Sequence, residues 1–236
     1  MNNRIAFTLA EVLITLAIIG IVAAMTIPTL ISTYKKHTVE TKLKRFYSTM
    51  SQAVKLSEID NGEVSSWDSI DAETIRMDDG SYAGEISNVY EWYNKYFAPY
   101  IKTVKVEKLE NDHDGQILIY FADGSMAGVG STAWTYYPNA KDYTRTLNET
   151  TKYYDRDRTL CGKKYFTLYF NPKSNSTFHK GKGVEPYAVQ WDGNIETLVT
   201  NNRLGCKENA TVERAYCTKL IQINGWKIPD NYFYKF

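Results

Sequence analysis

Glu11 is the residue of this 236-residue chain that is hardest to explain as an ordinary surface charge. It lies within residues 7–31, where 18 of 25 residues are Ala, Val, Ile, Leu, Met or Phe, and no charged residue occurs between positions 12 and 33. A carboxylate at the edge of an apolar core costs several kcal/mol unless it is paired or neutralised. We therefore expect Glu11 to have a cationic partner.

The apolar segment that contains Glu11 is long enough to cross a membrane, because about 20 residues of helix span a bilayer core of roughly 30 Å. Three interpretations fit it: a signal peptide cut after the small residues 22–24, a plain N-terminal anchor, and a leader cut in front of Phe7. A signal peptide has no use for Glu11, whose charge cancels that of Arg4. Cleavage before Phe7 instead creates an ammonium group four residues from Glu11, which supplies the partner.

A resemblance to a known family is carried by the sequence AFTLAEVLI at positions 6–14. It resembles the cleavage and methylation motif of type IV pilins and type II secretion pseudopilins. The resemblance implies that a prepilin peptidase cuts between Ala6 and Phe7, that Phe7 is then N-methylated, and that Glu11 and Pro28 serve filament assembly. Ala6 departs from the glycine that is commonest before the cut, although it is also small. The signal-peptide and plain-anchor interpretations stay open beside it.

Three cysteines, Cys161, Cys206 and Cys217, lie in the part of the chain that the resemblance places outside the cytoplasm, where disulfides form. Cys206 and Cys217 bracket a short loop, whose closure would contribute roughly 2–4 kcal/mol. Many pilins close a C-terminal loop in this way, so the resemblance favours the pair Cys206–Cys217. A bridge from Cys161 to either of the others, or no bridge at all, remains an alternative.

The sequence contains little that indicates catalysis or metal binding. The three histidines are scattered, and HExxH, P-loop and G-x-S-x-G motifs are missing. The acidic run at 110–115 resembles the start of an EF-hand loop, but Phe121 occupies the position of its calcium-binding glutamate. With 28 Lys and Arg against 27 Asp and Glu, the chain has no basic excess for nucleic acid. We expect no enzyme, no cofactor, no metal site and no nucleic-acid partner.

The apolar segment is expected to continue as an amphipathic helix. Mostly apolar residues recur at steps of three and four, and lysines and arginines occupy the other faces. This stripe consists of Val39, Leu43, Phe46, Met50, Val54 and Ser57. Asn61-Gly62 is a stop signal. The sequence therefore predicts one long spine helix from Phe7 to about residue 60.

Strand and turn patterns follow the spine. Asp123-Gly124 separates two alternating runs and is the strongest hairpin signal of the chain. Helices are expected at 72–77, 89–97 and 211–222, and long loops at 131–160 and 171–186. Strands are expected at 103–108, 116–121, 125–129, 165–170, 187–191 and 195–199.

A long helix followed by strands predicts an α+β fold in which the spine packs on an antiparallel β-sheet. The resemblance implies the same pilin-like fold. The expected domains are a prepilin leader (1–6), a transmembrane helix (7–31), an amphipathic continuation of the spine (32–61) and a globular head (62–236). The resemblance further implies a single-pass inner-membrane protein, with its N-terminus in the cytoplasm and its head periplasmic or extracellular.

The function expected from the resemblance is that of a structural subunit of a type IV pilus-like filament, most closely a pseudopilin or minor pilin of a type II secretion-like system. The expected partners are copies of itself or other pilins and pseudopilins, the prepilin peptidase, the assembly platform of the membrane, and inner-membrane lipid. The alternative is a membrane-anchored or secreted extracytoplasmic binding domain or enzyme that does not polymerise.

Overall fold

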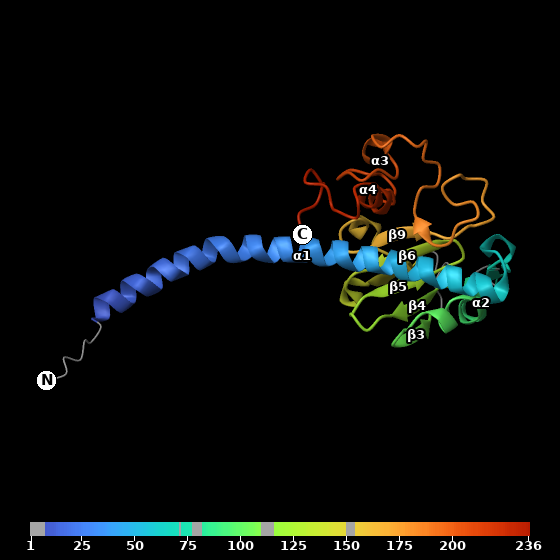
Figure 1. Ribbon diagram of the computed structural model, residues 1–236, viewed down its shortest axis with the longest axis horizontal. Helices are drawn as coiled ribbons and strands as arrows, with labels where there is room; N and C mark the ends of the chain where they lie inside the picture. The colour runs from blue at the N-terminus through green and yellow to red at the C-terminus, as the bar shows by residue number, and fades with distance from the viewer. Residues whose placement is uncertain (1–7, 71, 77–81, 110–115, 150–153) are drawn as a thin grey trace.

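A computed structural model of the chain describes residues 8–70, 72–76, 82–109, 116–149 and 154–236. Its largest element is α1 (Leu9–Asn61), a helix of 53 residues whose N-terminal half projects away from a head (Figure 1). The other helices are η1 (Val64–Ser66), α2 (Val89–Tyr96), η2 (Ala98–Tyr100), η3 (Ala140–Asp142), η4 (Arg158–Leu160), α3 (Thr197–Thr200) and α4 (Cys217–Ile223). The strands are β1 (Ala72–Arg76), β2 (Tyr82–Ser87), β3 (Lys105–Lys108), β4 (Ile117–Tyr120), β5 (Met126–Val129), β6 (Ala133–Tyr137), β7 (Arg145–Leu147), β8 (Tyr154–Arg156), β9 (Phe166–Tyr169) and β10 (Glu185–Pro186).

The spine helix ends where the sequence predicts. Gly62 has a φ of 76°, which glycine adopts without steric cost, and its N–H donates to the carbonyl of Glu58 at 3.0 Å. The predicted stripe is confirmed, because α1 buries one face in the head at steps of three and four residues. The buried residues of this face are Glu40, Leu43, Phe46, Met50, Ala53, Val54 and Ser57.

A six-stranded antiparallel sheet forms the centre of the head, in the order β10-β9-β6-β5-β4-β3. Successive side chains of a strand point to opposite faces. Ile117 and Ile119 accordingly join the core beneath α1, whereas Leu118 joins a smaller cluster that also holds Met126 and Tyr165. The α+β fold, with a long helix packed on an antiparallel sheet, is confirmed.

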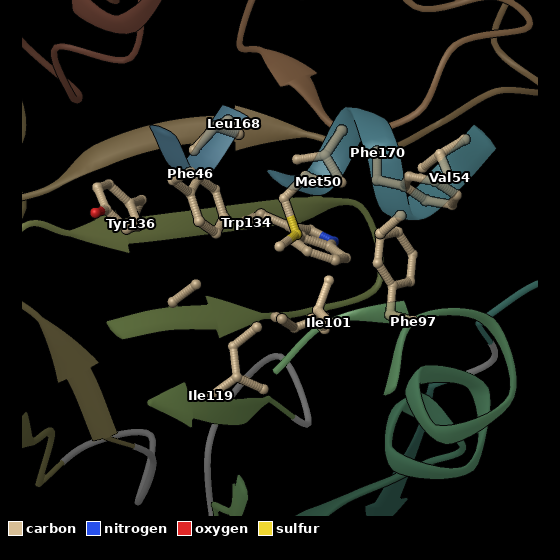
Figure 2. Close-up of a cluster of buried hydrophobic side chains, with 14 of the residues drawn as sticks. Phe46, Met50, Val54, Phe97, Ile101, Ile119, Trp134, Tyr136, Leu168 and Phe170 are labelled. Atoms are coloured by element: carbon tan, nitrogen blue, oxygen red, sulfur yellow. The ribbon is translucent and has the colours of Figure 1, made fainter. Parts of the chain in front are cut away.

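The main core lies between α1 and the sheet. Figure 2 shows Phe46 and Met50 of α1 next to Trp134 and Leu168 of the strands, and Val54 further along the helix. All five are at most 6% exposed. Burial of large apolar side chains contributes about 1.5–3 kcal/mol each, so this layer fixes the helix on the head.

The hairpin predicted at Asp123-Gly124 is confirmed. Gly124 has a φ of 77°, and the carboxylate of Asp123 accepts hydrogen bonds from the N–H and hydroxyl of Ser125, at 3.0 and 2.6 Å. These bonds close the turn between β4 and β5. The helix expected at 89–97 and the strands expected at 103–108 and 165–170 are also present, each shortened by one or two residues.

Two expected helices are wrong in whole or part. Residues 72–77 contain β1, which pairs with β2 so that Thr74 faces Glu85, and this pairing with a later segment overrides the local pattern. The helix expected at 211–222 begins only at Cys217. Its first part is not helical because the N–H of Tyr216 donates to the carbonyl of Leu204 and not to the preceding helical turn.

Two expected strands and one expected loop are also wrong. Residues 187–191 form no strand, because Pro186 lacks an N–H for the ladder and Gln190 has a φ of 61°. Residues 195–199 lead into α3, after Asp192 accepts hydrogen bonds from the Asn194 N–H and the Thr197 hydroxyl. The loop expected at 131–160 contains β6, β7 and β8, and β6 is a central strand of the sheet.

Candidate functional site

The N-terminal half of α1 carries large apolar side chains that nothing in the structure covers. Residues 8–31 are exposed except for the half-buried Ala23, although most of them are aliphatic. The exposed fraction of Leu9 is 79%, that of Met25 is 72% and that of Leu30 is 70%. A contiguous apolar surface of this length is rarely exposed to water in a soluble protein and indicates contact with a membrane or with other proteins. The helix is long and apolar enough to cross a membrane once.

Glu11 and Thr8 close the start of this helix. The Thr8 N–H and the Thr8 hydroxyl both donate to Oε2 of Glu11, at 2.8 and 2.9 Å, and the Glu11 N–H donates to Oγ1 of Thr8 at 3.2 Å. This is a capping box, which satisfies N–H groups that a helix otherwise leaves unpaired. The hydrogen bonds to the carboxylate reach one of its oxygens, Oε2, and do not cancel its negative charge.

Pro28 lies inside α1, and the helix continues through it. Because proline has no N–H, it contributes no hydrogen bond to the ladder at this point. Nearby hydroxyls donate back to the helix, Thr26 to the carbonyl of Val22 and Thr33 to that of Thr29, each at 2.9 Å. Such bonds often accompany helix bending. α1 curves along its N-terminal half in Figure 1.

The head grips α1 where its apolar half ends. Glu40 is 6% exposed, and its carboxylate accepts from Lys227 Nζ and from the Ile228 N–H, both at 2.9 Å. Lys42 Nζ donates to the carbonyls of Asp123 and Pro138, at 2.7 and 2.9 Å. These two residues tie α1 to the C-terminal segment and to two turns of the sheet.

The far end of α1 is fastened as well. The Tyr100 hydroxyl donates to Asp60 at 2.7 Å, and Asn61 donates to the same hydroxyl oxygen at 3.3 Å. Trp67 donates its indole N–H to the carbonyl of Gly62 at 2.9 Å. The head therefore holds α1 from Glu40 to Gly62 as one unit.

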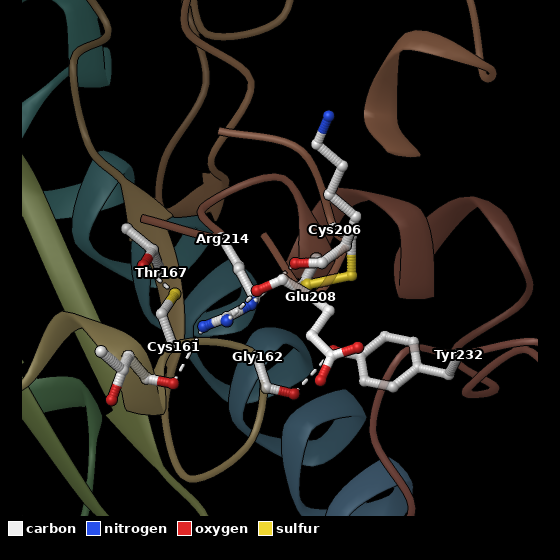
Figure 3. The surroundings of a disulfide bond; sticks show 10 residues. Cys161, Gly162, Thr167, Cys206, Glu208, Arg214 and Tyr232 are labelled. Carbon is white, nitrogen blue, oxygen red and sulfur yellow. Dashed lines mark hydrogen bonds between the residues drawn. A yellow bond between two sulfur atoms is a disulfide. The ribbon is translucent and has the colours of Figure 1, made fainter. Parts of the chain in front are cut away.

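A disulfide joins Cys206 to Cys217 at the start of α4 (Figure 3). Arg214 lies between them in sequence, and its guanidinium donates to the carbonyls of Lys207, Thr159 and Glu208. One arginine thus satisfies three backbone acceptors of a segment with little regular structure. The disulfide and Arg214 together fix the C-terminal part of the head.

Cys161, the third cysteine, is fully buried beside this disulfide segment, with its Sγ 3.4 Å from the Thr167 hydroxyl. Burial raises the pKa of the Cys161 thiol, so it stays protonated and unreactive. Tyr232 donates to the carbonyl of the next residue, Gly162, at 2.7 Å. Figure 3 shows these groups around the disulfide.

A group of partly buried charged residues lies between α1, β10 and α4. Glu185 accepts a hydrogen bond from the Tyr47 hydroxyl at 3.1 Å, and burial raises the pKa of Glu185 above its ordinary value. Burial also lowers the pKa of Lys219 below its ordinary value. Burial and the positive charge of Lys219 together lower the pKa of His179 to about 4. At neutral pH His179 is therefore uncharged.

Two models of known protein families together match nearly the whole chain. Residues 29–236 match a family described as a family of unknown function, DUF6613. The chain belongs to this family. Residues 1–27 match the prokaryotic N-terminal methylation motif. No curated protein and no solved structure matches the chain.

The methylation motif confirms the predicted resemblance: the chain begins with a type IV pilin-like prepilin leader. The protein is therefore type IV pilin-like, and α1, the one helix among the described residues that is long and apolar enough to cross a membrane, fits a single-pass membrane-anchored protein. A pilin-like subunit is a structural component, and the described residues hold no group of three or more His, Cys, Asp or Glu side chains that fits a metal ion.

The structure places the predicted site residues in two separate regions. Glu11 and Pro28 lie on the exposed half of α1, and Cys206 and Cys217 lie in the head. The cleavage residues Ala6 and Phe7 fall outside the described residues, as does the acidic run at 110–115.

The sequence did not predict three residues that position α1 and the C-terminal segment. They are Glu40, Lys42 and Arg214. Glu40 left one signal, because it lies three residues before Leu43 on the buried stripe, where a charge is out of place. Lys42 and Arg214 gave no such signal, because their acceptors are backbone carbonyls, which no side-chain pattern in the sequence identifies.

Proposed function

We propose that this protein is a subunit of a type IV pilus-like filament, most closely a pseudopilin or minor pilin of a type II secretion-like system. The observation that carries the proposal is the division of α1. In one continuous helix, the apolar side chains up to Ile31 are almost all exposed, whereas one face from Glu40 onward is buried in the head. Such a helix suits a subunit that first resides in lipid and then packs against other helices of the same kind.

The proposed processing follows from the leader. The prepilin peptidase cuts between Ala6 and Phe7, and Phe7 becomes the N-methylated first residue of the mature chain. Arg4 holds the leader on the cytoplasmic side, so the head lies in the periplasm or outside the cell. A disulfide between Cys206 and Cys217 suits that oxidising location.

Glu11 then takes a second partner in the filament. Its capping contacts with Thr8 leave the charge uncancelled, and a carboxylate buried among helices costs several kcal/mol without a cation. The Phe7 ammonium of an adjacent subunit supplies that cation. A subunit at the wrong height would bury an unmatched charge, so the pair sets the register of the filament.

The head follows α1 during assembly because it grips the helix at both ends of its buried half. The assembly platform extracts the membrane half, and other pilins or pseudopilins replace inner-membrane lipid as its neighbours. Pro28 lies near the end of the exposed half and allows local adjustment when helices pack. A head of about 175 residues, which is larger than a minimal pilin requires, favours a minor subunit.

The mass of the mature N-terminus tests the proposal. The full chain is expressed together with a prepilin peptidase, purified from membranes and analysed as intact protein and N-terminal peptides. We expect a chain that begins with N-methyl-Phe7. A chain that begins at Met25 would indicate signal-peptide cleavage, and one that begins at Met1 would indicate a plain anchor. Either result contradicts the proposal.

Two variants sharpen this measurement. Ala6→Gly keeps a small residue before the cut and is expected to be processed at least as well as the wild type. Ala6→Leu introduces a bulky side chain and is expected to accumulate as the unprocessed precursor. Equal processing of both variants would contradict recognition of a small residue at this position.

A further inference from the structure

A cavity of about 330 Å³ lies at the base of the head, beside the point where α1 leaves it. We call it the basal cavity. One wall is the segment of α1 at residues 34–42, and the others come from residues 138–142, 163–164 and the C-terminal tail. The C-terminus lies next to α1 at this level in Figure 1. The cavity is large enough for a small polar group such as a glycerophosphate.

The charges that line the basal cavity are mostly positive. Lys35, Lys42, Lys163 and Lys164 face a single acidic side chain, that of Asp142. Asp142 forms an ion pair with Lys164 at 3.2 Å, and Lys42 Nζ already donates hydrogen bonds to two backbone carbonyls. A net positive charge therefore remains around the cavity, and an anion would offset it.

Aromatic side chains form the rim of the same cavity. Tyr34 is 71% exposed, and Tyr234 and Phe236 line the tail side. Lys163 Nζ lies 5.5 Å from the ring centroid of Tyr234 and 5.8 Å from that of Phe233. Tyrosine beside lysine is the composition that membrane proteins place at the lipid headgroup level.

The position of the cavity along α1 agrees with that composition. Residues 12–31 of α1 span about 30 Å, which is the thickness of a bilayer core. Tyr34 and Lys35 then lie about 5 Å beyond the hydrocarbon, within the headgroup layer. The neighbouring Lys36 forms an ion pair with Asp230 at 3.2 Å and does not line the cavity. Of these two adjacent lysines, Lys35 is therefore the one that faces the cavity.

We propose that the basal cavity binds the phosphate headgroup of an anionic phospholipid in the outer leaflet of the membrane that α1 spans. The ligand class is an anionic glycerophospholipid, held by Lys35, Lys163 and Lys164, with Tyr34 and Tyr234 at the level of its glycerol. The inference rests on the proposed membrane residence of α1. The bound lipid keeps the head against the bilayer until assembly extracts the subunit.

Lipid retention by the full chain tests this inference. The protein is reconstituted in nanodiscs that contain equal amounts of phosphatidylcholine and phosphatidylglycerol, released into mild detergent, and analysed by native mass spectrometry for retained lipid. We expect the wild type to retain phosphatidylglycerol in preference to phosphatidylcholine by about tenfold or more. Lys35→Gln combined with Lys163→Gln and Lys164→Gln is expected to reduce the preference to near unity.

Matched variants separate the cavity from general surface charge. Lys55→Gln, Lys102→Gln and Lys180→Gln together remove the same charge from exposed positions in the half of the head around the end of α1. This triple variant is expected to keep the preference. Lys35→Gln alone changes an exposed side chain, so it leaves folding intact and is expected to lower the preference about fivefold. Asp142→Asn removes the one acidic side chain of the cavity and is expected to raise the preference for phosphatidylglycerol.

Three outcomes would overturn the inference. Equal loss in the cavity and control triples would assign the preference to net charge. Binding of inorganic phosphate to the detergent-solubilised chain, with the same dependence on Lys35, would assign the cavity to free phosphate. A wild type that inserts but shows no preference would overturn this inference alone, whereas extraction of the wild type by alkaline carbonate would overturn the proposed membrane residence as well.

Discussion

Glu40 accepts hydrogen bonds from Lys227 and from the backbone of Ile228 while its side chain is almost completely buried. Burial alone would raise the pKa of Glu40, but the bonds from Lys227 and Ile228 and the charges of Lys227 and Lys36 hold it below its ordinary value. The residue therefore stays ionised at neutral pH. It is the anion around which the C-terminal segment attaches to α1.

Glu40→Ala is expected to lower the free energy of unfolding by about 2–4 kcal/mol, because it leaves the buried N–H of Ile228 without its acceptor. The measurement is urea unfolding of the full chain in detergent, followed by tryptophan fluorescence. Asp230→Ala is the control, since Asp230 forms an exposed ion pair with Lys36 and should contribute less than about 1 kcal/mol. Equal effects of the two variants would contradict the role of Glu40.

The pKa of Glu185 is shifted in the opposite direction from that of Glu40, and this shift predicts a pH dependence of stability. Burial raises its folded-state pKa above the ordinary value of 4.5. Stability from this residue is therefore present below pH 4.5 and is lost as the pH rises through the raised pKa. Glu185→Gln keeps an acceptor for Tyr47 but cannot ionise. We therefore expect the urea midpoint of the variant to exceed that of the wild type by more at pH 7 than at pH 4.5.

The exposed residue Glu63 provides the control for this pH comparison. Glu63→Gln removes one carboxylate from an exposed position and is measured at the same two pH values as Glu185→Gln. A pH-independent difference for Glu185→Gln would contradict the assignment, because it would mean that ionisation of Glu185 has no energetic cost in the folded head.

At the scale of elements, the C-terminal segment has little regular structure and depends on cross-links. Only α3 and α4 are helical after β10, and the segment between them is held by the disulfide and by Arg214. A covalent link restricts the unfolded chain most where few other contacts specify the fold. The docking of the tail on α1 through Lys227 and Ile228 depends on the same segment.

Cys206→Ala together with Cys217→Ala is expected to lower the free energy of unfolding by about 2–4 kcal/mol. Reductant should destabilise the wild type by a similar amount and leave the double variant unchanged. Cys161→Ala, which keeps the disulfide, is the control and should remain sensitive to reductant. A wild type whose urea midpoint ignores reductant would argue against a stabilising bridge.

Elements also show how far local patterns reach. The hairpin at Asp123-Gly124 was predictable because two adjacent residues dictate its backbone geometry. β1 and β6 were not, because pairing with other segments makes them strands: β1 pairs with β2, and β6 pairs with β5 and β9. β6 lies between β5 and β9 in the sheet, and the partner β9 comes about 30 residues later in the chain.

At the scale of the whole molecule, the proposed role of Glu11 is to pair one subunit with the next in the filament. Glu11→Ala and Glu11→Val are expected to insert into the membrane normally, since they make the segment more apolar. Both are expected to reduce filament incorporation by at least about tenfold, because the Phe7 ammonium of a neighbour loses its partner. The measurement compares carbonate-resistant membrane protein with protein in sheared filaments.

Two variants distinguish the charge of Glu11 from its capping contacts with Thr8. Glu11→Gln keeps an oxygen that accepts from Thr8 but removes the charge, and is expected to fail in assembly like Glu11→Ala. Thr8→Ala weakens the cap by about 1 kcal/mol and keeps the charge, and is expected to assemble. The reverse pattern would assign Glu11 to helix capping alone.

The membrane half of α1, its leader motif and the stripe from Val39 to Ser57 followed from the sequence alone. These features depend on which residues are apolar and at what spacing, and neighbours in the chain suffice to define them. The α+β class followed from the order of helix and strands. Only the tertiary structure decided that Glu40 meets Lys227 and that Lys35 shares a cavity with Lys164. These partners lie more than 100 residues apart, and only packing of the whole head brings such groups together.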